Sequence, residues 1–316
     1  YDIAIKQNKL SSAITLSSQG MNLLLAGEEM ARSKDGDENS YSSSPTLNMI
    51  DWRLVETNAD LVSYYKGMME LRKVFSPMTA PTKDSEDDTY KYMFHTSLAG
   101  SSKTIAYTVD NTTEGEWNKV AVMFNGTNAT TTQTLKTNVD KGISKETEWV
   151  IIANDKQAGI KKLGEVKGLS FKLAPFSTII AVEKETFEAC NFESEFSTVY
   201  INHVDGRTGE IFKTNTIMGK PGEGYIASAD KAIPLKYEID TIEGDTIGKF
   251  AETDTDVNYV YKNFVPDSLK AENGDITGDG YLTIVDATKV QRYLAHLDEF
   301  DDTTKAKADY NYDKDI

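Results

Sequence analysis

Residues 18–34 read SQGMNLLLAGEEMARSK, and this stretch decides how the first part of the chain is expected to fold. Its centre, residues 21–26, is a continuous apolar run, typical of a short strand covered on both faces. Residues 3–16 show helical spacing before it, and after a long polar loop the same spacing recurs in Leu61, Tyr64, Tyr65, Met68 and Leu71. Thr57, with Asp60 three residues later, predicts the start of that second helix. The order helix, buried strand, loop, helix predicts one turn of an α/β architecture, whose other strands are expected upstream.

The composition excludes several classes of function. The 316 residues include 34 basic and 50 acidic side chains, a net charge of −16, and such an acidic surface repels nucleic acid. No apolar stretch approaches the roughly 20 residues that span a bilayer, so no membrane span is expected. A lone cysteine, Cys190, excludes an internal disulfide and a multi-cysteine zinc site.

The central part of the chain has the two-residue period of β-strands. A charged connector at residues 81–88 precedes it, and short strands separated by Gly, Asn and Asp turns predict a β-sandwich over 89–183. A hairpin with its turn at 205–209 then opens a small β-rich module at 197–262. The strands expected across both regions are 90–95, 104–109, 119–125, 132–137, 149–154, 169–182, 198–204, 210–214, 235–240 and 257–261.

Residues 275–286 read DITGDGYLTIVD, a spacing typical of a calcium-binding loop. Oxygen ligands at positions 1, 3, 5, 7, 9 and 12 of such a loop surround the ion, and Gly at position 6, here Gly280, makes the turn. A second copy begins 34 residues later. The predicted ligands are Asp275, Thr277, Asp279, Tyr281, Thr283 and Asp286, followed by Asp309, Asn311, Asp313 and Asp315. The alternative is a solvated acidic loop that merely resembles the motif.

The tandem loops resemble the type I dockerin, because position 12 is Asp and a single helix follows each loop. The resemblance covers residues 273–316, and Lys314 departs from it where Gly is expected. It implies Ca²⁺ as the bound ion and a cohesin domain of a scaffoldin protein as partner. It also implies a set of recognition residues on the first helix, namely Ile284, Val285, Gln291 and Arg292.

A second resemblance lies in the first 80 residues. AGEE at 26–29, NSY at 39–41 and N-x-x-D-W at 48–52 are similar to the last strand and loop of a type I pullulanase, in the α-amylase superfamily. This implies that residues 1–80 end a (β/α)₈ barrel and that the loop faces an α-glucan such as pullulan or starch. The candidate contacts are Glu28, Tyr41, Asn48, Asp51 and Trp52. Each could instead cap or turn the loop, and residues 43–46 (SSPT) lack the acid usual in that family.

The catalytic carboxylates are not expected in this chain. Glu28 and Glu29 are consecutive on the predicted strand, so they would point to opposite faces and could not meet at one glycosidic bond. The resemblance places the catalytic Asp, Glu and Asp before Tyr1, so this chain alone should be inactive. In that superfamily an all-β domain follows the barrel, which fits 89–183 as a packing partner.

Residues 197–262 resemble a mucin-binding-protein (MucBP) repeat, a β-grasp-like module. The similarity rests on VYINHVDGRTGE, GKPGEGY and VNYVYK. It implies a spacer or a contact with mucin or other glycans. The three histidines, His95, His203 and His296, are far apart in sequence and predict isolated surface or core roles.

Together these patterns predict a multidomain fold: the end of a (β/α)₈ barrel, an all-β sandwich, a small β-grasp-like module and an α-helical EF-hand-like dockerin. The predicted function is a secreted, extracellular starch-debranching glycoside hydrolase that cleaves α-1,6-glucosidic links with retention. A calcium-dependent dockerin would attach it to a scaffoldin. The alternative is a non-catalytic adhesion or assembly protein that uses the MucBP-like and dockerin modules.

Overall fold

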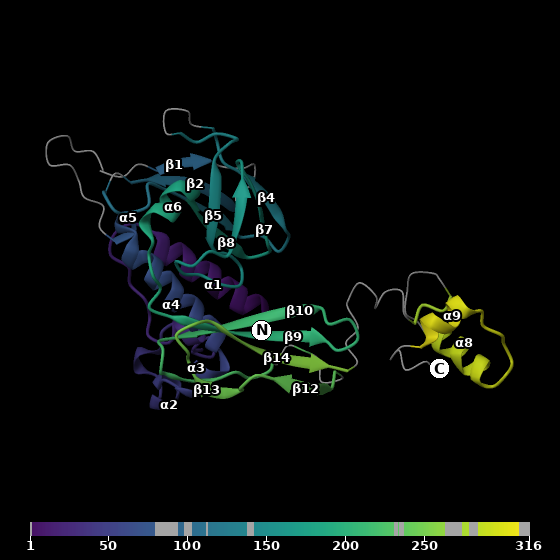
Figure 1. Ribbon diagram of the computed structural model, residues 1–316. Helices are drawn as coiled ribbons and strands as arrows, with labels where there is room; N and C mark the ends of the chain where they lie inside the picture. The colour runs from purple at the N-terminus through teal and green to yellow at the C-terminus, as the bar shows by residue number, and fades with distance from the viewer. Residues whose placement is uncertain are drawn as a thin grey trace. The chain divides into compact units, whose positions relative to one another are not determined.

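The chain forms two compact units. Figure 1 labels their helices and strands. The first unit holds Tyr1–Tyr200, Asn215–Ala227 and Thr246–Thr255, and the second holds Ile201–Thr214, Ser228–Asp245 and Asp256–Ile316. The predicted module at 197–262 is divided between the two, so the domain boundaries given above stay predictions. The computed structural model describes residues 2–79, 94–97, 103–111, 113–137, 142–230, 233, 237–262, 274–277 and 284–309.

The first 80 residues are mainly helical. Their elements are α1 (Asp2–Ser17), η1 (Glu28–Met30), η2 (Ser40–Ser42), α2 (Pro45–Asn48), α3 (Arg53–Thr57), α4 (Ala59–Val74) and α5 (Ser76–Thr79). Both predicted helices are confirmed, because the apolar stripe of α4 packs against Leu10, Ala13 and Leu16 of α1. The predicted start of α4 was wrong: Thr57 ends α3, and the residue before α4 is Asn58. The side chain of Asn58 donates instead to the Met30 carbonyl at 2.8 Å.

The strand predicted at residues 21–26 was also wrong. These residues have no regular secondary structure, and Met21 and Leu23 are 100% and 94% exposed. A strand exists through backbone hydrogen bonds to a neighbouring strand, and none of the described strands pairs with this segment. The apolar run indicates a segment suited to burial, but within residues 21–26 only Leu24 packs, half-buried, against the core of the first unit.

A six-stranded antiparallel sheet forms the centre of the first unit. Alternate residues of its third strand point to opposite faces: Val120 and Val122 join the core with α1 and α4, whereas Ala121 and Met123 join a second core. In sheet order the strands are β1 (Phe94–Ser97), β2 (Thr104–Asp110), β3 (Lys119–Asn125), β8 (Ser177–Glu183), β5 (Glu148–Ala153) and β6 (Gly164–Lys167).

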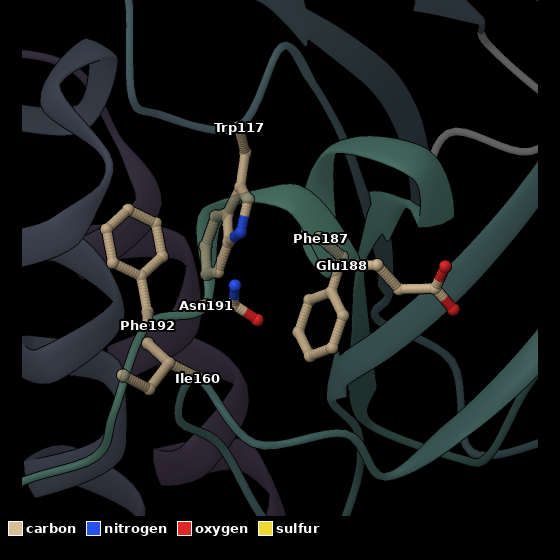
Figure 2. A pocket seen from close by; sticks show the side chains of 6 residues that line it. All are labelled: Trp117, Ile160, Phe187, Glu188, Asn191 and Phe192. Carbon is tan, nitrogen blue, oxygen red and sulfur yellow. The ribbon is translucent and has the colours of Figure 1, made fainter.

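A two-stranded sheet, β4 (Thr131–Thr134) with β7 (Ser170–Leu173), contributes to the second core. Phe171 and Leu173 of β7 are buried there with Trp149 of β5. The strands predicted between 104 and 182 are thus confirmed, although the stretch 169–182 is two strands. Helix α6 (Lys184–Cys190) follows β8, and a cavity of about 320 Å³ opens beside it (Figure 2).

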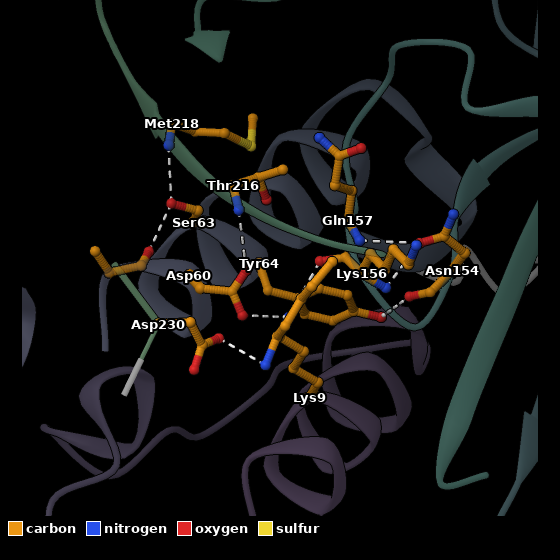
Figure 3. A network of polar contacts seen from close by, with 12 residues as sticks. Lys9, Asp60, Ser63, Tyr64, Asn154, Lys156, Gln157, Thr216, Met218 and Asp230 are labelled. Carbon is orange, nitrogen blue, oxygen red and sulfur yellow. Dashed lines mark hydrogen bonds and ion pairs between the residues drawn. The ribbon is translucent and has the colours of Figure 1, made fainter. Parts of the chain in front are cut away.

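A partly buried polar network ties α1 and α4 to the turn after β5 and to strand β10 (Ile211–Gly219), as Figure 3 shows. The ammonium group of Lys9 lies 2.6 Å from the Asp60 carboxylate, donates to the Lys156 carbonyl at 3.1 Å and lies over the Tyr64 ring. The other oxygen of Asp60 accepts from the Thr216 backbone N–H at 3.3 Å. Because every charge in this network has a partner, its burial is tolerated.

The predicted hairpin after residue 197 is confirmed. Its turn is closed by the Asp205 backbone N–H, which donates to the Glu210 carbonyl at 2.9 Å, and Gly209 has the positive φ of 75° that the turn requires. A four-stranded sheet has the order β10, β9 (Ser197–Asp205), β14 (Thr255–Tyr261) and β12 (Ile239–Glu243). Strands β11 (Gly224–Ile226) and β13 (Ile247–Lys249) form a separate pair.

The last described residues form two short helices, α8 (Ile284–Leu294) and α9 (Asp302–Ala308). Asp301 caps α9, because its carboxylate accepts from the Thr304 backbone N–H at 2.7 Å. The Gly274 N–H donates to the Lys307 carbonyl at 2.8 Å, which joins the start of the first loop to the second helix. Of all the helices that the structure describes, none is both long and apolar enough to cross a membrane.

Candidate functional site

The loop over residues 27–52 is held by Arg32. Gly27 has φ of 101°, and a Cβ at that position would lie 2.6 Å from Cδ of Arg32, so the arginine can pack there only against glycine. The guanidinium of Arg32 donates to the Ala26 carbonyl at 3.0 Å and also to the Asn48 carbonyl. One side chain therefore joins the two ends of the loop.

Asn48 is the centre of this loop rather than a free contact residue. Its amide N–H₂ donates to the carbonyls of Ser40 at 2.7 Å and Ser43 at 3.2 Å. Its amide oxygen accepts from the Ser40 hydroxyl at 3.0 Å and from the Lys34 ammonium group. The sequence analysis missed Arg32 and Lys34, since no local pattern links them to a residue 14 or 16 positions away.

Asp51 and residues 43–46 also have structural partners. Arg53 donates to the Asp51 carboxylate from Nε at 2.8 Å and from a terminal nitrogen at 2.7 Å, and these hydrogen bonds hold the pKa of that carboxyl below its ordinary value. Ser44 caps α2, with its hydroxyl accepting from the Leu47 N–H at 3.4 Å, and Pro45 occupies the first turn. The loop is therefore well ordered by its own side chains.

The two aromatic candidates are open to solvent. Tyr41 is 87% exposed and Trp52 is 70% exposed. Glu28 is exposed too, but it lies in the 3₁₀ turn η1 and not on a strand, so the strand geometry predicted for Glu28 and Glu29 was wrong. The Glu29 carboxylate accepts from the Gly27 N–H at 2.9 Å, and this hydrogen bond holds the carboxylate within the turn. Among the predicted contacts, Tyr41, Trp52 and Glu28 remain accessible.

The first acidic loop brings two of its predicted ligands together. Asp275 and Asp286 are buried, and both carboxylates face Thr277. The Thr277 backbone N–H donates to Asp286 at 2.9 Å, and the Thr277 hydroxyl oxygen lies 3.1 Å from Asp275 and 3.0 Å from Asp286. A hydroxyl has one proton and can donate to only one of the two carboxylates at a time. Such a cluster of oxygens with two negative charges fits a hard cation.

Of the other predicted metal ligands, the structure describes Asp309. Asp309 is described and lies just after α9, where its N–H donates to the Lys305 carbonyl at 3.0 Å. Within the part of the chain that is described, no group of three or more Asp, Glu, His or Cys side chains is assembled for a metal. Outside the described residues lie Asp279, Tyr281, Thr283, Asn311, Asp313 and Asp315.

The predicted partner-binding residues lie on an exposed part of α8. Ile284 is 80% exposed and Val285 is 53% exposed, which is unusual for two consecutive β-branched apolar residues. Gln291 is exposed. Arg292 is held by Asp298, to which its Nε donates at 2.8 Å.

Comparison with known proteins finds a MucBP domain at residues 198–262. This confirms the MucBP resemblance noted in the sequence. The match covers the strands from β9 to β14, whose core contains the fully buried His203.

Several proteins of described activity are similar to this chain over short stretches of sequence. The pullulanase of Bacillus subtilis (strain 168) is 40% identical over 67 residues, which are 21% of this chain and 9% of that protein. The glycogen debranching enzyme of Enterobacter sp. (strain 638) is 34% identical over 73 residues, 23% of this chain and 11% of that protein. The solved type I pullulanase of Bacillus subtilis str. 168 with maltose has a TM-score of 0.48 and 22% identity, covering 57% of this chain and 24% of that chain.

These comparisons confirm a relation to debranching glycoside hydrolases over part of the chain. The matched stretches span about a tenth of the relatives' length. The chain is therefore related, in part, to pullulanase-type glycoside hydrolases of the α-amylase family, and it also carries a MucBP domain.

Proposed function

We propose that this protein acts in the debranching of α-glucans, as part of a pullulanase-type hydrolase that cleaves α-1,6-glucosidic links with retention. The observation that carries the proposal is the 40% identity with a pullulanase over 67 residues. The ordered loop around Asn48 and the exposed rings of Tyr41 and Trp52 support it.

The loop is suited to hold a sugar in a fixed place. A glucose ring has an apolar C–H face and a rim of hydroxyls, so it packs on an aromatic ring and forms hydrogen bonds at its edge. Trp52 directly follows Asp51, whose carboxylate accepts from Arg53, and the loop before it is fixed by Arg32 and Asn48. A loop held in place before the ligand arrives loses little entropy on binding.

The contact can be tested by NMR on the whole chain labelled with ¹⁵N. Titration with maltotriose should shift the indole N–H resonance of Trp52 in a saturable way. Trp149 is an internal reference, because it is fully buried and its indole N–H donates to the Gly168 carbonyl at 3.0 Å. Tyr41→Ala should weaken binding about threefold to tenfold, as expected for an aromatic contact of roughly 1 kcal/mol. Ile247→Ala, another exposed large side chain, is the control. An unmoved Trp52 signal would contradict the proposed contact.

We further propose that residues 273–316 bind Ca²⁺ as a dockerin and present α8 to a cohesin domain of a scaffoldin. The buried carboxylates of Asp275 and Asp286 around Thr277 support the metal site, and the exposed Ile284 and Val285 support a partner surface. Calcium would supply the positive charge that offsets two buried carboxylates. The proposal places the protein outside the cell, secreted or scaffold-associated, with starch or pullulan as substrate.

Adhesion is the second candidate function, and the MucBP match at 198–262 favours it. In that case mucin or another glycan would be the ligand, and catalysis would play no part. Binding of the whole chain to immobilised mucin, compared with binding to pullulan, separates the two. Retention on mucin together with an unmoved Trp52 resonance in maltotriose would favour adhesion.

A further inference from the structure

The cavity beside α6 lies within the first unit, away from the loop around Asn48 in sequence. It is lined by three aromatic rings, one aliphatic side chain and two polar side chains, and its volume is about 320 Å³ (Figure 2). Small-molecule sites are typically apolar pockets of about 300 to 1,000 Å³ with a few placed polar groups. The cavity is therefore large enough for one ring-sized ligand. Its lining residues are Trp117, Ile160, Phe187, Glu188, Asn191 and Phe192.

One hydrogen-bond donor in this cavity has no acceptor. Trp117 is 1% exposed, and its indole N–H is buried without a hydrogen-bond partner. Leaving such a donor unpaired costs about 1 to 3 kcal/mol. Figure 2 shows the indole nitrogen on the side of the ring that faces the Asn191 amide, with Phe187 and Phe192 on either side. An acceptor atom entering the cavity would remove this cost.

Neighbouring contacts hold the indole in that orientation. The Trp117 ring stacks on Phe187 at a centroid distance of 6.2 Å, and Phe192 packs against it edge-on at 5.3 Å. Asn191 ends α6 in the left-handed conformation, with φ of 44°, which turns the chain so that Phe192 follows directly beside the cavity. These contacts hold the indole N–H of Trp117 in one orientation, as a binding site requires.

The lining selects against charged ligands. The edge of an aromatic ring is its positive part, so an indole N–H that points inward disfavours a cation. None of the six lining residues is basic, so no cation is present to pair with an anion, and the carboxylate of the exposed Glu188 points away from the rings in Figure 2. A neutral ligand remains, with an oxygen that accepts from Trp117 and a hydroxyl that donates to the amide oxygen of Asn191.

We infer that this cavity is a second carbohydrate-binding site, which takes one neutral hydroxylated ring and holds it away from the loop around Asn48. A hexose fits because its C–H face packs on Phe187 or Phe192 and its hydroxyls meet Trp117 and Asn191. The choice of a glucosyl unit among such rings rests on the proposed function. A site of this kind would keep the protein on a glucan chain between encounters at the loop.

The test is the same ¹⁵N titration of the whole chain with maltotriose, read at the indole N–H of Trp117. That resonance should move and saturate while the Trp149 resonance stays in place. Asn191→Gly removes the amide and suits the positive φ, and it should weaken binding about threefold to tenfold. Glu185→Gln, an exposed carboxylate on the same helix, is the matched control and should change nothing.

The outcomes separate this site from the proposed function. A Trp117 resonance that does not move while Trp52 responds would overturn the second site and leave the loop intact. Movement of Trp117 that is insensitive to Asn191→Gly would also overturn it. Saturable movement with tetramethylammonium or inorganic phosphate as probes would contradict the selection for a neutral ligand. Movement of Trp117 without Trp52 would support this site and contradict the loop contact.

Discussion

Acidification is expected to destabilise the MucBP domain through His203. This side chain is fully buried, and its Nδ1 lies 2.9 Å from the Tyr261 hydroxyl. Its ring lies against the rings of Phe212, Tyr259 and Tyr261 at centroid distances of 6.2, 5.9 and 5.8 Å. Burial lowers the pKa of His203 from 6.5 to about 4. The folded domain therefore resists protonation of a group that the unfolded chain protonates readily.

The sign and size of the effect follow from that pKa. Between pH 6.5 and about 4 the unfolded state binds a proton that the folded state does not, so the free energy of unfolding falls as the pH falls. Each unit of pKa difference corresponds to about 1.4 kcal/mol, so the total loss is about 3 kcal/mol. The neighbouring Asp230 opposes the shift, whereas Lys213 adds to it.

Amide hydrogen exchange in β9 and β14, corrected for the intrinsic effect of pH, measures this loss within the domain. His203→Gln keeps a polar side chain that cannot titrate, so its unfolding free energy should change less between pH 7 and pH 4. His296→Gln, at an exposed position, is the control and should retain the full slope. An identical slope in the wild type and His203→Gln would refute the reasoning.

Three further changes test other parts of the structure. Asp286→Asn should raise the calcium concentration needed for the gain of helical circular dichroism at least tenfold, because it removes a buried carboxylate that accepts from the Thr277 backbone N–H and lies 3.0 Å from the Thr277 hydroxyl. The exposed Asp302→Asn should leave that concentration unchanged, and equal effects would exclude Asp286 as a ligand. Gly67→Ala would place a Cβ 1.8 Å from the Ala158 carbonyl oxygen, so it should lower the free energy of unfolding measured in urea by about 3 kcal/mol. The control Gly164→Ala should leave that free energy nearly unchanged, and a stabilised Gly67→Ala variant would contradict the packing of α4. Asn48→Ala should weaken maltotriose binding at Trp52 about tenfold, because it removes the hydrogen bonds that hold the loop. Asn39→Ala, at an exposed position, should leave binding unchanged, and unchanged binding in Asn48→Ala would contradict the role of Asn48.

Regular elements were predictable where the chain supplies both sides of the packing. The stripe of apolar residues on α4 has its partner in α1, and the alternating residues of β3 each have a core to enter. Local periodicity and tertiary burial therefore agree there. Residues 21–26 show the opposite case. An apolar run indicates that burial would be favourable, but it does not indicate whether a neighbouring strand is present.

The candidate sites were predictable only in part, because their geometry depends on contacts between distant residues. Composition indicated a polar loop with Tyr41 and Trp52, but the position of Asn48 at its centre depends on Arg32 and Lys34. The cavity beside α6 had no sequence signal at all. It arises where Trp117, in the turn before β3, meets aromatic residues about 70 positions later in the chain.

The most direct test of the central claim is the action of the native protein, purified from its source, on pullulan. Reducing ends and their anomeric form should be followed together by proton NMR during the first minutes of the reaction. The expected result is cleavage of α-1,6 links with the α-anomer formed first, as a retaining mechanism requires. No release of reducing ends, or the β-anomer formed first, would contradict it.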